Sequence, residues 1–62
     1  MTARQEVIRF CKLYNIEVNG KGGIPLLSKG DDLECCDDWE AARKFLIAQR
    51  DRKQVGEKAR FI

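Results

Sequence analysis

The sequence predicts a small α+β domain in which two helices flank a β-hairpin, in the order α-β-β-α. Apolar residues recur at helical spacing near both ends of the chain. Between them, two apolar-rich segments are separated by turn-forming residues, as in a hairpin. The length of 62 residues supports only one modest core. We therefore expect residues 1–62 to form a single domain with both helices packed on one face of a small sheet.

The first helix is expected from Ala3 to about Asn15. Thr2 followed by Gln5 matches the capping box, in which the threonine side chain caps a backbone amide and the glutamine reaches back. The apolar positions that follow share one helix face: Val7, Ile8, Cys11 and Tyr14, with Phe10 and Leu13 widening the stripe. Residues 16–18 then form a short extended exit, with a third strand as the open alternative. The glycine-rich residues 19–23 break regular structure.

The hairpin is expected from residues 24–28 and 33–36, joined by the turn residues Lys29-Gly30-Asp31-Asp32. Pro25 has no amide hydrogen, so we place it at the start of an edge strand. The two cysteines at 35 and 36 should point to opposite faces, one buried and one exposed.

The second helix is expected to begin at Asp37 and to extend to Lys53 or Gln54. Asp37 and Glu40 form the D-x-x-E version of the capping box. The residues that share its apolar face are Trp39, Ala42, Phe45, Leu46 and Gln49. Gly56 begins a tail, residues 56–62, for which the sequence leaves flexibility and folding back as open alternatives.

The composition argues against an enzyme. The chain has no histidine, one serine and one threonine, so we predict no catalytic residues, no cofactor and no small-molecule substrate. Three cysteines without histidine leave a zinc site short of a ligand, and residues 31–40 lack the EF-hand spacing. The loop Gly20-Lys21-Gly22-Gly23 leads into a strand and lacks the P-loop pattern. We therefore predict no metal site.

The chain is expected to act in the cytoplasm. It shows no secretory signal and no apolar run long enough to cross a bilayer, so no membrane partner is predicted. Cys11, Cys35 and Cys36 are odd in number, which favours reduced thiols over a disulfide framework. The alternative is a disulfide from Cys11 to one of the adjacent pair.

Charge is segregated along the chain. Residues 31–40 hold six acids and no base, whereas residues 41–62 hold seven bases and two acids. Residues 1–30 hold five bases and two acids, which leaves a net charge of +2. The pattern indicates two different surfaces.

The first function hypothesis is a small accessory or regulatory protein that binds another protein, as an adaptor or inhibitor. An acidic patch can dock a basic partner, a tryptophan is a frequent interface anchor, and an unpaired hairpin edge invites partners, including a second copy. The side chains expected to contact the partner are Asp31, Asp32, Glu34, Trp39, Phe61 and Ile62. Phe61 and Ile62 either fold back over the sheet or offer an apolar tip to another chain. Small accessory proteins of bacteriophages or mobile elements share this size and lack of catalytic equipment, an analogy that no motif carries.

The alternative is nucleic-acid binding by the basic second helix and tail. The side chains that would contact phosphates are Arg43, Lys44, Arg50, Arg52, Lys53, Lys58 and Arg60. A solvated helix end explains the same residues, because cations favour the negative pole of the helix dipole. The sequence pI of about 8.6 is below that of a committed nucleic-acid domain.

Overall fold

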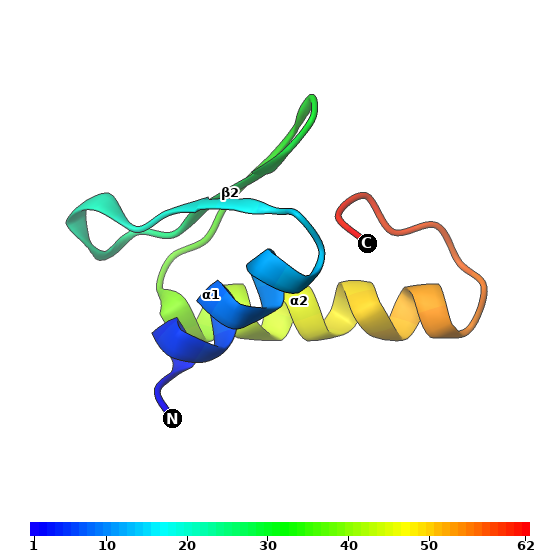
Figure 1. The fold of residues 1–62 in the computed structure, drawn as a ribbon, viewed down its shortest axis with the longest axis horizontal. Helices are drawn as coiled ribbons and strands as arrows, with labels where there is room; N and C mark the ends of the chain where they lie inside the picture. Colours follow the sequence, from blue (N-terminus) through cyan, green and yellow to red (C-terminus); the bar gives the residue numbers. More distant parts are fainter.

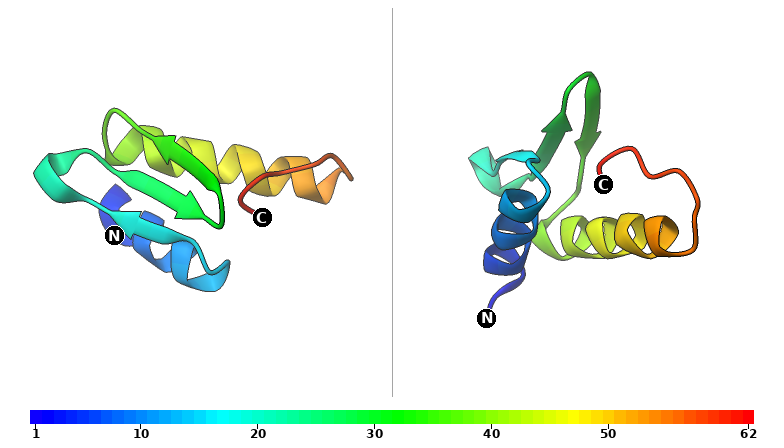
Figure 2. Two further views of the ribbon diagram at one scale, coloured as in Figure 1. Left: turned by 90° about the horizontal axis from the view of Figure 1, so that it is seen from above. Right: turned by 45° about the vertical axis from the view of Figure 1, so that its right-hand side comes forward.

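The computed structural model describes residues 1–62 and confirms the α+β fold class, with two helices and a three-stranded antiparallel sheet. The elements in chain order are α1 (Ala3–Leu13), β1 (Glu17–Asn19), the 3-10 turn η1 (Lys21–Gly23), β2 (Leu26–Lys29), β3 (Asp32–Cys35) and α2 (Trp39–Gln54). Both helices lie on the same side of the sheet (Figure 1). Seen from above, α1 lies beneath β1 and α2 runs on the β3 side (Figure 2).

The third strand, left open by the sequence at residues 16–18, is present as β1 one residue later, so that Asn19 ends the strand instead of breaking it. Val18 stands opposite Leu27, so β1 pairs with β2 and the strand order is β1-β2-β3. The expectation that Pro25 starts an edge strand is therefore wrong, because β2 is central. Pro25 lies just before β2, where no ladder hydrogen bond is lost, and its carbonyl accepts a hydrogen bond from the Cys36 N–H at 2.9 Å.

Helix α1 has the predicted capping box. The Thr2 hydroxyl accepts from the Gln5 N–H at 3.2 Å, and the Gln5 side chain accepts from the Thr2 N–H at 3.0 Å. The helix ends at Leu13, two residues before the predicted end. Asn15 takes the left-handed conformation, φ 58°, and the Ile16 N–H then bonds back to the Cys11 carbonyl, which closes the helix end.

The predicted N-cap of the second helix, Asp37, is wrong by one residue, and the helix itself begins at Trp39. Asp38 is the N-cap, and its carboxylate accepts a hydrogen bond from the Ala41 N–H at 2.7 Å. With Asp38 as the cap, Glu40 lies one position before the capping-box position, and its carboxylate binds Arg43. The end at Gln54 agrees with the prediction.

The core lies between the helices and the inner face of the sheet. Its buried side chains are Val7, Cys11, Ile16, Leu27, Cys36, Ala42, Leu46 and Phe61. Cys36 is buried and Cys35 is exposed, as the strand alternation predicts. All three cysteines are free thiols, so the alternative of a disulfide from Cys11 is not realised.

Residues 56–62 carry no helix or strand, but Phe61 is completely buried. Its ring meets Phe45 edge to face at 5.4 Å between centroids. The Phe61 carbonyl accepts from Lys29 Nζ at 3.1 Å, and its N–H donates to Gln49 Oε1 at 3.5 Å. The tail therefore folds back, which is one of the two alternatives left open by the sequence. The other alternative, an apolar tip at Phe61 offered to another chain, does not hold, because the Phe61 ring is buried in the core.

Candidate functional site

The side chains predicted to bind a protein do not form one surface. Asp31 lies at the tip of the hairpin, while α2 begins at the hairpin's other end (Figure 1). Trp39, the first residue of α2, is half-buried against Gly20, and the Arg4 guanidinium lies 5.8 Å from its ring centre. Trp39 therefore packs the start of α2 against the loop that follows β1.

The remaining acids and the tail of this predicted set are also dispersed. Glu34 is ion-paired with Arg60 at 3.2 Å. Asp32 stands opposite Lys29 in the strand register at the turn end of the hairpin. Phe61 is buried, and Ile62 is partly buried beside it.

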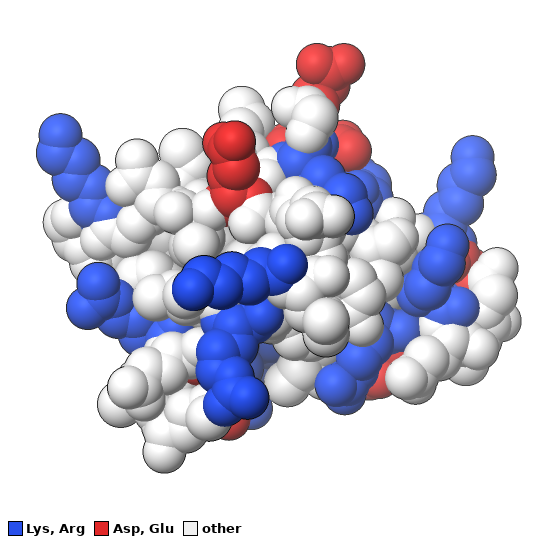
Figure 3. All heavy atoms as spheres, in the orientation of Figure 1, with Lys and Arg blue, Asp and Glu red and all other residues white.

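Four of the seven basic residues predicted to bind nucleic acid already face carboxylates of this chain. Arg52 lies 3.7 Å from Glu57, Arg60 pairs with Glu34, and Arg50 lies 3.9 Å from Asp51. The fourth, Arg43, contacts two acids and is described below. The three others form no ion pair: Lys44, Lys53 and Lys58. On the face seen in Figure 3 the basic side chains lie in groups separated by uncharged surface, one of them near the end of α2, and acids lie toward the hairpin.

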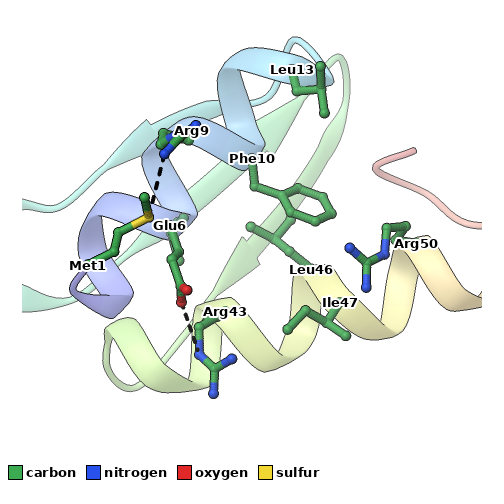
Figure 4. A pocket seen from close by; sticks show the side chains of 10 residues that line it. Met1, Glu6, Arg9, Phe10, Leu13, Arg43, Leu46, Ile47 and Arg50 are labelled. Carbon is green, nitrogen blue, oxygen red and sulfur yellow. Dashed lines mark hydrogen bonds and ion pairs between the residues drawn. The ribbon is translucent and has the colours of Figure 1, made fainter.

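A groove lies on the surface between α1 and α2. This interhelical groove has a volume of about 430 Å³. The helices diverge from the contact between Glu6 and Arg43, and Phe10 lies in the angle between them (Figure 4). The partly exposed side chains of Phe10 and Ile47 form its apolar floor, and the buried side chains of Val7 and Leu46 border it. Leu13 lies at its wider end.

Local sequence explains why the floor is apolar. Val7 and Cys11 point into the core, and Phe10 and Leu13 extend the same stripe toward the side of α1. On α2, Leu46 points into the core and Ile47, one position further on, lines the groove. Because the helices diverge, neither covers the flank of the other, and Leu13 remains 73% exposed.

Three arginines line the groove around this floor: Arg9, Arg43 and Arg50. The only acid among the lining residues is Glu6, which lies 3.6 Å from Arg43. Arg43 also hydrogen-bonds Glu40, which raises the pKa of Arg43 and lowers the pKa of Glu40. Its charge is thus shared between two carboxylates.

The guanidinium groups of Arg9 and Arg50 have fewer hydrogen-bond and ion-pair partners than that of Arg43. Arg9 donates only to the weak acceptor Met1 Sδ, at 3.7 Å. The Arg50 guanidinium carbon lies 6.0 Å from the centre of the Phe10 ring, and Asp51 is at the limit of ion pairing. Arg50 Nε is buried and has no hydrogen-bond partner. The rest of the Arg50 side chain is exposed, 43% overall, so its other guanidinium N–H groups remain available to an added acceptor.

The sequence reasoning missed the groove as a site. It had identified the apolar stripe of α1 and the basic residues of α2, but it did not place Phe10 beside Arg50, 40 positions later in the chain. The signal that could have found it was the width of the α1 stripe, which is greater than one contact with a core requires.

The structure groups no three Cys, Asp or Glu side chains in a way that could hold a metal ion. Neither α1 nor α2 has the length and apolar character that crossing a bilayer requires. No family model, curated protein or solved structure was found to match this chain.

Proposed function

We propose that this chain is a small non-enzymatic protein-binding module, of adaptor or inhibitor type, and that the interhelical groove is its binding surface. The observation that carries the proposal is an apolar floor left open by the fold and lined by three arginines. Aromatic and arginine side chains are the residues most enriched among the energetic anchors of protein interfaces. Covering Leu13 and Phe10 would remove apolar surface from water, which favours association.

We propose the cytoplasm as its compartment, because three cysteines, two of them adjacent, are unlike the paired sets that secreted small domains carry. Nucleic-acid binding by α2 and the tail is the competing function. The absence of ion pairs at Lys44, Lys53 and Lys58 supports it, since these side chains are available to phosphates.

Site-specific photo-crosslinking in the cells that naturally express this protein tests the proposal. A photoreactive phenylalanine analogue replaces Leu13 at the wide end of the groove, and a second variant carries it at Ala48. Both positions are exposed, but Ala48 lies on the solvent face of α2 and does not line the groove. We expect a discrete protein adduct from position 13 that Ile47→Glu abolishes, and none from position 48.

Other outcomes decide between the functions. An adduct of twice the chain's mass identifies the partner as a second copy. Equal adducts from both positions contradict the groove as the binding surface. Adducts from position 48 that nuclease treatment removes, with none from position 13, favour nucleic-acid binding instead.

A further inference from the structure

The geometry of the groove points to the kind of partner that it binds: we propose an acidic amphipathic helix about two turns long. This inference rests on the proposed function and specifies its partner. The helix would place apolar side chains on the floor formed by Phe10 and Ile47. Its carboxylates would bind Arg9 on one side and Arg50 on the other.

The length of the groove fits a helix. Along α1 the lining runs from Glu6 to Leu13, and along α2 it runs from Arg43 to Arg50. Each wall therefore spans seven residue steps, or about 10 Å at the α-helical rise. A helix of the same length presents apolar residues at i, i+3 or i+4, and i+7 on one face. An extended strand would cover about 10 Å in three residues and place only two side chains on the floor.

The charges decide the sign of the partner. Arg9 and Arg50 come from different helices and lie on different sides of the floor (Figure 4). Arg9 faces no carboxylate of this chain, and Arg50 faces only Asp51, at 3.9 Å, with 43% of its side chain exposed. A carboxylate can accept two hydrogen bonds from one guanidinium, so an acid at each side satisfies both arginines. Arg43 is already shared between Glu6 and Glu40 and contributes less.

The floor argues against a nucleic-acid ligand at this place. Phe10 and Ile47 offer apolar surface where a sugar-phosphate backbone needs hydrogen-bond donors. An amphipathic helix uses both features at once, because its apolar face covers the floor and its acidic flanks meet the arginines.

An amide-resolved NMR titration of the full chain tests the inference. The probe is a synthetic peptide of about 12 residues, with Leu at i, i+4 and i+7 and Glu on the flanks, long enough for two turns and their caps. One control peptide has the same composition with the Leu residues scattered around the helix. A second has Lys in place of Glu. We expect the first peptide to shift the amides around Phe10, Leu13, Ile47 and Arg50, and both controls to leave them unchanged.

Matched variants assign the contacts. Arg50→Gln and Arg9→Gln should each lower the affinity for the peptide about fivefold, which is the effect of losing one partly exposed ion pair. Arg52→Gln removes the same charge from α2 outside the groove and should change affinity by less than about twofold. Raising NaCl from about 50 to about 300 mM should weaken binding, since salt screens exposed charges. The dispersion of each variant's spectrum checks that it is folded.

Several outcomes overturn the inference. If the peptide with scattered Leu residues binds equally well, the partner need not be amphipathic. If the Lys peptide binds equally well, the partner need not be acidic. Equal losses from Arg50→Gln and Arg52→Gln reduce the effect to net charge. Shifts at the groove from a short DNA duplex but not from the peptide assign the arginines to phosphate. If the peptides fail while crosslinking at position 13 still captures a protein, the proposed function stands and the acidic helix is wrong.

Discussion

Replacing Phe61 by alanine is expected to remove at least a third of the stability of this domain. The ring is completely buried, packs edge to face on Phe45, and is anchored by hydrogen bonds from its backbone to Lys29 and Gln49. It fills the space between α2 and the hairpin, so its removal leaves a cavity that the short tail cannot close. The tail is therefore part of the core.

The magnitude follows from the size of the chain. Truncating a buried phenylalanine costs about 3–5 kcal/mol. At about 0.05–0.15 kcal/mol per residue, a domain of 62 residues has a total stability of about 3–9 kcal/mol. The variant should therefore lose at least a third of its unfolding free energy. Its melting temperature should fall by more than about 12 °C, since each kcal/mol shifts a domain of this size by about 4–8 °C.

Urea unfolding followed by Trp39 fluorescence and far-UV circular dichroism measures the effect. Ile62→Ala is the matched control, because Ile62 is the next residue and is only partly buried. It should cost less than about 1 kcal/mol. A Phe61→Ala variant within about 1 kcal/mol of the unmodified chain would refute the argument, because the ring could not then be buried as described.

Three further predictions concern the cysteines and the cap of α2. With a thiol reagent near neutral pH, Cys35 should react at once and the buried Cys11 and Cys36 only as fast as the chain opens; rapid labelling of all three would contradict their burial. Burial raises the pKa of Cys11 from 9.0 to about 11, so the native state keeps a proton that the unfolded chain loses. The contribution of the protonated Cys11 thiol to the unfolding free energy is therefore complete below about pH 9. This contribution, about 3 kcal/mol, is lost as the pH rises through 11. Cys11→Ala should remove this part of the slope in unfolding free energy against pH, and an unchanged slope would contradict the assignment. Asp38→Ala should cost about 1 kcal/mol in urea unfolding and Asp37→Ala clearly less; the reverse order would restore Asp37 as the cap.

The helix and hairpin elements were predictable because they depend on residues close together in sequence. Thr2 and Gln5 cap α1 across three positions, and Gly30 takes the left-handed conformation, φ 62°, that the hairpin turn requires. The first turn of α2 was predictable only to within one residue. Asp37 and Asp38 are both good caps, and the direction in which the backbone leaves β3 decides between them.

The candidate site was less predictable than the fold. The sequence reasoning placed Arg50 among phosphate-binding residues, whereas in the structure its guanidinium lies over Phe10. It also predicted that Trp39 contacts a protein partner, whereas in the structure the Trp39 ring packs against the loop at Gly20. Both differences arise because a long side chain reaches whatever the tertiary fold brings near, and residue type alone does not say what that is.

The sequence by itself therefore determined the class of the fold, the two helices, the hairpin and the alternation of Cys35 and Cys36, all of which follow from periodicity, caps and turns within a few residues. Only the tertiary structure decided that β1 pairs with β2, that Phe61 enters the core, and that α1 and α2 diverge to leave a groove. These features join residues distant in the chain, and their free energy comes from burial and pairing that exist only once the elements have met.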